Sequence, residues 1–138
     1  MHANRMTLNL TLLTALLLPL AVPAAPPPGL LREVAVENRP ALRVAYVEQV
    51  GHFQANPEIY DVLLQQLLDW AVPANLWNFP AQTLIVCIYP DDTAATPPDQ
   101  QRLWLGITID ETAAPPDPLR TLVLPAGPHA VGRFSIPS

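Results

Sequence analysis

One segment of the sequence, residues 57–72, has the apolar repeat of an α-helix and is bounded by Pro57 and Pro73. Apolar residues recur in it at intervals of three and four, the spacing that brings side chains to one face of a helix. Asn56 is expected to cap the first turn, Pro57 suits the first helical position, and Pro73 ends the helix. Any fold for this chain must therefore place one long helix against the structure that the other segments form.

The segment Leu42–Val50, which precedes the helix, alternates between two sets of side chains as a β-strand does. Tyr46 and Glu48 belong to one set. The segment Arg102–Asp110 alternates in the same way, with Trp104 on one face and a row of aliphatic residues on the other. Both segments predict strands with two chemically different faces.

Four further segments have strand character. Gln82–Pro90 is a continuous apolar run, which predicts a strand buried on both faces or nearly so. The other three segments are Leu31–Glu37, Leu119–Leu124 and His129–Phe134. Most loops between these segments have the length of hairpin connections, so the sequence predicts an α+β fold with a mostly antiparallel sheet and one long helix.

Charge and composition exclude several classes of function. The chain has 138 residues and a formal charge of −5, and its seven basic residues are all arginines. Nucleic-acid binding needs a basic face, so no nucleic-acid partner is expected. The single cysteine, Cys87, lies in an apolar run and is expected to be a small buried side chain. We predict no cofactor and no metal site, because no ligand spacing or phosphate-binding loop is present.

The amino-terminal residues 1–24 have the pattern of a secretory signal peptide. Arg5 supplies the positive region, an apolar region follows, and small residues stand at the cleavage positions before Ala25. We expect residues 25–30 to form a proline-rich linker and residues 31–138 to form the domain. The protein is therefore expected to be exported, either periplasmic or secreted. The alternative is an uncleaved membrane anchor, which the short apolar run and Pro19 disfavour.

Three motifs together resemble the GyrI-like small-molecule-binding domain, which includes effector-binding domains of AraC-type and MerR-type regulators. They are "RVAYVEQVGHF" at 43–53, "IYPDDTAATPPDQQR" at 88–102 and "VLPAGPHAVGRF" at 123–134. The resemblance implies two strand–helix–strand–strand units that enclose a ligand cleft between helices and sheet. Here the first unit has all its elements. The second is expected to be incomplete, with only its first strand.

The resemblance implies non-catalytic binding of a small hydrophobic molecule, cationic or neutral, in a cleft between helix and sheet. Aromatic walls and a few polar groups are typical of such sites, and aromatic faces attract cations. The expected ligand-binding residues are Tyr46, Glu48, Tyr60 and Trp104. Glu48 is the candidate counter-charge if its strand face lines the cleft, and an ordinary exposed carboxylate if that face meets solvent.

Two alternatives stay open at this point. Some relatives of this type resemble hydrolases of reactive small molecules, but no catalytic residue is assigned here, because the only serines, Ser135 and Ser138, lie at the chain end. A single unit also leaves an open sheet edge and an uncovered cleft. A homodimer that supplies the missing half, or a protein–protein element without its own ligand, would cover them.

The signal segment gives the first testable prediction. Mass spectrometry of the protein expressed in a bacterial host is expected to find a mature chain that begins at Ala25 in the exported fraction. An intact Met1 in the cytoplasmic fraction would contradict the signal assignment.

Overall fold

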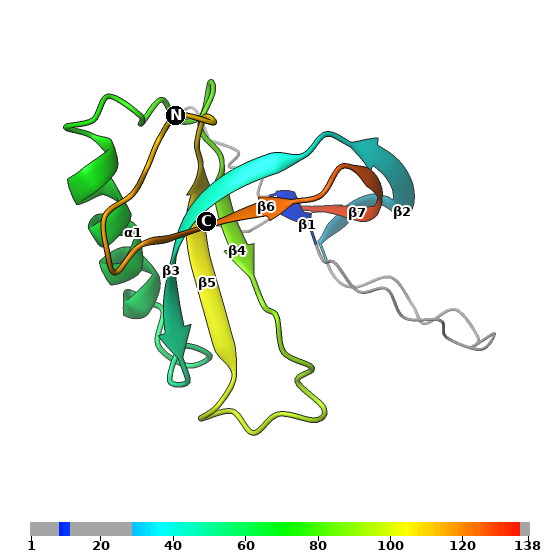
Figure 1. Cartoon of the computed structure of the whole chain (residues 1–138). Helices are drawn as coiled ribbons and strands as arrows, with labels where there is room; N and C mark the ends of the chain where they lie inside the picture. The colour runs from blue at the N-terminus through cyan, green and yellow to red at the C-terminus, as the bar shows by residue number, and fades with distance from the viewer. Residues whose placement is uncertain (1–8, 12–28, 136–138) are drawn as a thin grey trace, which may run out of the picture. The chain divides into compact units, whose positions relative to one another are not determined.

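The computed structural model describes residues 9–11 and 29–135, and these residues divide between two compact units. One unit is formed by residues 40–126 and the other by the described residues on either side, 9–11, 29–39 and 127–135. Each unit has its own sheet. The α+β prediction is confirmed: the residues that the structure describes contain one helix, and all their paired strands are antiparallel (Figure 1).

The helix α1 spans Glu58–Ala71 and belongs to the 40–126 unit. It ends before Pro73, as predicted, and Glu58 and Asp61 place negative charge in its first turn, where the helix dipole favours it. The predicted Asn56 cap is wrong: Pro57 occupies the N-cap position, and no side chain caps the helix. Asn56 contributes its backbone carbonyl instead, which accepts a hydrogen bond of 3.2 Å from the amide of Ile59.

The sheet of the 40–126 unit has four strands in the order β4-β5-β3-β6. Their bounds are β3 Leu42–Val50, β4 Ile85–Ile88, β5 Arg102–Thr108 and β6 Arg120–Leu124. The central pair, β3 and β5, is in register over seven residues, from Val44 opposite Thr108 to Val50 opposite Arg102. The chain order β3–α1–β4–β5 is the strand–helix–strand–strand unit that the sequence predicted.

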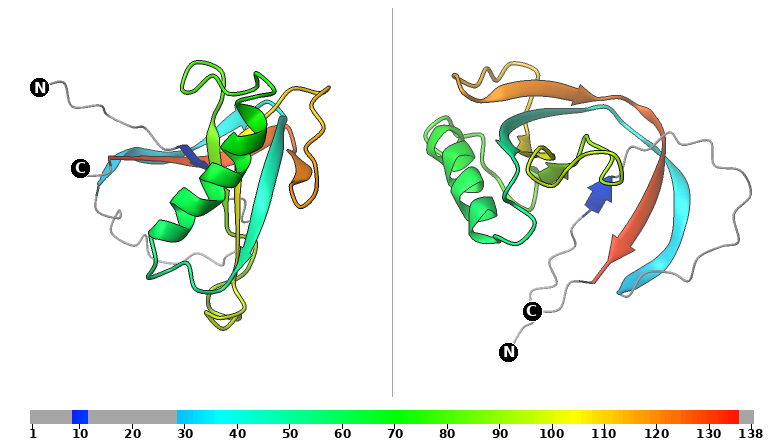
Figure 2. Two further views of the ribbon diagram at one scale, coloured as in Figure 1. Left: turned by 90° about the vertical axis from the view of Figure 1, so that its left-hand side faces the viewer. Right: turned by 90° about the horizontal axis from the view of Figure 1, so that it is seen from below.

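Helix α1 packs against one face of this sheet, where it contacts β3 and β5 (Figures 1 and 2). Aliphatic side chains from both layers fill the interface. The buried core consists of Val47, Phe53, Leu63, Leu67, Ala71, Leu103, Leu105, Ile107 and Leu119. The face of β5 that carries its aliphatic residues is therefore the helix face, and Trp104 lies on the opposite, helix-free face.

Strand β4 differs from its prediction. The apolar run Gln82–Pro90 predicts a strand buried on both faces or nearly so, but β4 covers only Ile85–Ile88 and all four residues are half-buried. The reason is its position, because β4 pairs with β5 alone and forms an edge of the sheet. A local apolar pattern shows that a segment is hydrophobic, but it does not show the position of that segment in the sheet.

Residues 9–11, 29–39 and 127–135 form the second, three-stranded sheet, in the order β1-β7-β2. Its strands are β1 Asn9–Thr11, β2 Leu30–Arg39 and β7 Gly127–Phe134, and Figure 2 shows β2 and β7 as a long curved ribbon. Glu37 and Arg133 link these two strands through hydrogen bonds of 2.6 and 3.1 Å. Strand β1 lies within the predicted signal peptide. The rest of that segment and most of the predicted linker lie outside the described residues.

Gly106 permits the close approach of β5 to β3. A Cβ atom at this position would lie 2.5 Å from Val44 Cγ1, 2.7 Å from the carbonyl oxygen of Ala45 and 3.1 Å from Tyr46 Cβ. Distances this short require the two central strands to move apart.

We therefore predict that Gly106→Ala lowers the free energy of unfolding by about 1–3 kcal/mol, the usual penalty for overpacking. Urea denaturation followed by circular dichroism measures the change. Gly132→Ala is the matched control, because its nearest contact, at 3.0 Å, is the ring of Phe134, a side chain that can move. Equal unfolding midpoints for Gly106→Ala and the unmodified protein would contradict the prediction.

Candidate functional site

The pairing of β3 with β5 brings three of the four predicted ligand-binding residues together. Glu48 lies opposite Trp104, and Tyr46 lies opposite Gly106, two pairs further along the ladder. All three side chains are on the helix-free face, since they alternate with the core residues of their strands. We call Tyr46, Glu48 and Trp104 the aromatic site.

Direct contacts connect the three side chains. The indole nitrogen of Trp104 donates a hydrogen bond of 2.8 Å to Oε2 of Glu48. The rings of Tyr46 and Trp104 have centroids 5.1 Å apart and are inclined by 36°, within the range of favourable aromatic pairs. Tyr46 is 8% exposed, and Glu48 and Trp104 are half-buried. The site thus offers apolar ring surface beside a carboxylate whose orientation is fixed by an indole.

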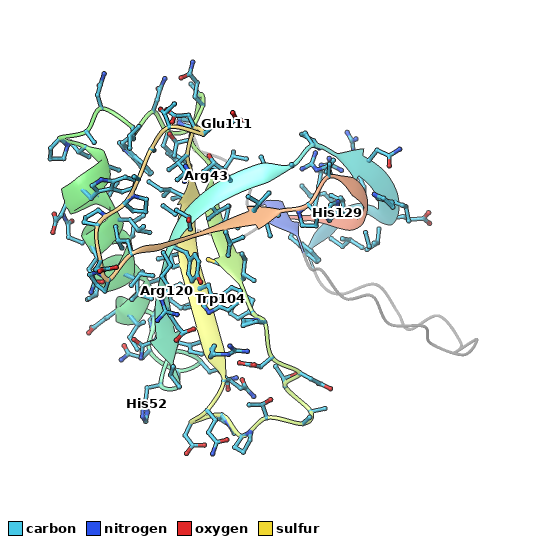
Figure 3. All side chains as sticks on the ribbon, in the orientation of Figure 1. Arg43, His52, Trp104, Glu111, Arg120 and His129 are labelled. Atoms are coloured by element: carbon cyan, nitrogen blue, oxygen red, sulfur yellow. The ribbon has the colours of Figure 1, made fainter. Side chains whose placement is uncertain are left out.

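Arginines border the aromatic site on two sides. Arg102 lies on the same face of β5 as Trp104, with its guanidinium carbon 5.5 Å from the centroid of the Trp104 ring. Arg120 of β6 pairs with Tyr46 in the ladder and is exposed (Figure 3). Neither arginine was among the predicted binding residues. The alternation of 102–108 could have placed Arg102 beside Trp104, but the pairing of Arg120 with Tyr46 depends on strand order.

Arg102 is fixed by Asp91 through several hydrogen bonds. Its Nη2 donates to Oδ1 of Asp91 at 2.7 Å, its Nε donates to both carboxylate oxygens at 3.0 and 3.1 Å, and its backbone amide donates to Oδ2 at 2.8 Å. Hydrogen bonding to the Arg102 side chain lowers the pKa of Asp91, and the same bond raises the pKa of Arg102. This ion pair connects the loop after β4 to the start of β5.

Tyr60, the fourth predicted ligand-binding residue, lies outside the aromatic site. Its hydroxyl lies 3.2 Å from the hydroxyl of Tyr89. The pKa of Tyr89 is raised, mainly because the side chain is partly buried. Both tyrosines border a pocket of about 290 Å³ between the start of α1 and the end of the sheet. Its lining residues are Phe53, Gln54, Tyr60, Tyr89, Asp91, Thr93, Gln101 and Arg102. The Asp91–Arg102 pair thus adjoins this pocket as well as the aromatic site.

The other side chains considered as reactive groups or metal ligands are Cys87, His52 and His129, and their surroundings are typical of structural residues. Burial raises the pKa of the Cys87 thiol to about 11, as expected for a cysteine packed against the core. His52 is exposed at the bend after β3 (Figure 3), and His129 Nδ1 lies 2.9 Å from the carbonyl oxygen of Gly127. Residues 9–11 and 29–135 contain no group of three or more His, Cys, Asp or Glu side chains that could hold a metal ion. No helix in the same residues is long and apolar enough to cross a membrane.

Comparison with known proteins gives two similarities. The family model of the GyrI-like small molecule binding domain matches residues 32–137. A relative from Bacillus subtilis (strain 168), described as "SPbeta prophage-derived putative transcriptional regulator YosT", is 28% identical over 101 residues. That match covers 72% of this chain and 63% of the relative, so the chain spans less than two thirds of the relative's length.

The Asp91–Arg102 pair predicts a specific dependence of stability on pH. The pKa of Asp91 is lowered in the folded protein, so the carboxylate stabilises the fold above its unfolded pKa of about 3.9. This contribution is lost as the pH falls through the lower, folded value. The difference in unfolding free energy between the unmodified protein and Asp91→Asn is expected to shrink as the pH is lowered below about 4.

Urea denaturation at a series of pH values measures this difference. Asp92→Asn is the matched control, because it removes the same charge from the same loop and the Asp92 side chain bonds only to the Ala94 amide among the described residues. A difference for Asp91→Asn that stays constant from pH 6 to pH 2 would contradict the assignment.

Proposed function

The chain belongs to the GyrI-like small-molecule-binding domain family, and on this basis we propose that it binds a small hydrophobic molecule, with a preference for cations, at the aromatic site. The family description supports binding of a small molecule. The identity and charge of the ligand and its location are our proposals. We propose binding without catalysis.

The observation that carries this proposal is the contact between Trp104, Tyr46 and Glu48. The Tyr46 ring packs against the Trp104 ring with centroids 5.1 Å apart, and the half-buried indole offers apolar surface. The Glu48 carboxylate accepts the indole hydrogen bond at 2.8 Å. Aromatic faces attract organic cations, and a nearby carboxylate adds Coulomb attraction. Among the described residues, Oε1 of Glu48 accepts no hydrogen bond, so it is available to a ligand's positive group.

We propose the helix-free face in place of the cleft between helix and sheet that the family resemblance implied. Core side chains from α1, β3 and β5 occupy the space between the helix and the sheet. The pocket beside Tyr60 and Tyr89 lies at the end of that interface and has a volume of about 290 Å³, near the lower limit for ligand pockets. We propose the aromatic site for the hydrophobic ligand because an indole, a phenol ring and a carboxylate meet there, and we place Tyr60 outside it.

Two further parts of the proposal rest on the sequence alone. We propose export because residues 1–24 have the pattern of a signal peptide. Cleavage before Ala25 would remove strand β1 from the sheet that it forms with β7. A homodimer is a separate proposal, which light scattering of the purified protein would test.

We predict that tryptophan fluorescence changes saturably when the protein is titrated with benzyltrimethylammonium, which combines an aromatic ring with a quaternary ammonium group. Trp104→Phe is expected to remove most of the response, and Trp77→Phe is expected to retain it, because Trp77 packs against the core of the helix face. Glu48→Gln keeps an acceptor for the indole and removes the charge, so affinity for the cation is expected to fall by about 5- to 30-fold.

The control for charge is Glu111→Gln, an exposed glutamate in a loop of the same unit (Figure 3). It is expected to bind as tightly as the unmodified protein. No saturable response to this cation or to a panel of larger hydrophobic cations would reject the proposed function. Equal affinities for Glu48→Gln and Glu111→Gln would reject the role of Glu48.

A further inference from the structure

The ring of Trp104 already has a cation over it. The guanidinium carbon of Arg102 lies 5.5 Å from the ring centroid, within the distance of about 6 Å at which a cation is attracted to an aromatic face. A cationic ligand would seek the same kind of position. The protein's own side chain thus occupies a position that the proposed ligand needs.

The strand register shows that Trp104 is bordered from both directions along β5. Arg102 precedes it by two residues on the same face, and Gly106 follows it by two. Because Gly106 has no side chain, the ring of Tyr46 from the opposite strand lies on that side, 5.1 Å from Trp104. Tyr46 and Arg102 therefore cover the indole between them, and Arg102 is the charged member of the two.

The Arg102 side chain is more exposed than that of its partner Asp91, but its movement has to break specific bonds. Its side chain is 40% exposed, whereas that of its partner Asp91 is 16% exposed. The guanidinium makes paired hydrogen bonds to the two oxygens of Asp91, at 2.7 to 3.1 Å, in the geometry that fixes an arginine most firmly. Asp91 thus holds the guanidinium at the edge of the aromatic site.

We infer that Arg102 is an internal competitor for the aromatic site. It occupies the indole face, and a ligand gains that face only by displacing the guanidinium. Asp91 raises the free energy required for this displacement. Arg102 therefore sets a threshold for specificity: a ligand must offer a larger aromatic surface, or a better contact with Glu48, than the guanidinium itself provides. This inference rests on the proposed function, because it concerns ligands of the same site.

The test compares two probes by isothermal titration calorimetry, benzyltrimethylammonium and neutral benzyl alcohol. Arg102→Ala removes the competitor, and both probes are expected to bind about 2- to 5-fold more tightly than they bind the unmodified protein. Asp91→Asn keeps the guanidinium but weakens its attachment, so a smaller gain in the same direction is expected. The Asp91→Asn variant also keeps the test valid if Arg102→Ala fails to fold.

Arg133→Gln is the control, because it removes an equal charge from another paired arginine, in the other sheet. It is expected to leave both affinities unchanged. Unchanged or weaker binding of both probes to Arg102→Ala and Asp91→Asn overturns the inference and leaves the proposed function standing. A gain for the cation alone shows that Arg102 acts through its charge and not by occupying the ring, which also overturns the inference. Absence of binding to all variants rejects the proposed function itself.

Discussion

The antiparallel pairing of β3 with β5 is the constraint on which the 40–126 unit depends. Seven consecutive residue pairs fix the register, and each strand presents one set of side chains to α1 and the other to the opposite face. A shift by one residue would exchange the two sets, so that Trp104 would face the helix and the core leucines would face away. The same ladder that builds the core therefore builds the aromatic site, and Gly106 allows the two strands to come close enough for both.

Side-chain alternation and helical repeat were sufficient to predict much of this arrangement. The faces of β3 and β5, the single helix and its end before Pro73 follow from local patterns, because burial of one face imposes a period on the sequence. The same patterns placed Tyr46 and Glu48 on one face, and Trp104 on one face of its own strand. Whether these two faces lie on the same side of the sheet depends on the register of β3 with β5, and the local patterns carry no information on register. The motif resemblance that accompanied them is confirmed by the match over residues 32–137.

Other features could not be predicted, because they depend on contacts between distant segments. Strand β4 has a sequence typical of a central strand and lies at an edge, since strand order is not written in local hydrophobicity. Tyr60 lies with Tyr89 rather than with Trp104, because the helix and the aromatic site lie on opposite faces of the sheet. Arg102 is different, because it lies two residues from Trp104 on the same strand, so the alternation of 102–108 could have placed it beside the indole.

The ribbon of β2 and β7 holds together the two ends of the chain segment that lies between its strands. Arg39 and Gly127 face each other at one end of the ribbon, and the chain between them forms the whole 40–126 unit. That unit is thus a long insertion in a hairpin, with its two ends held at neighbouring points. The entropy lost in closing so long a loop is offset by the β2–β7 ladder outside the unit and by the β3–β6 ladder inside it, where Leu42 pairs with Leu124. A short peptide that joins residues 40 and 126 would replace the ribbon as the connection between the two ends of the unit. The unit is therefore a candidate for circular permutation.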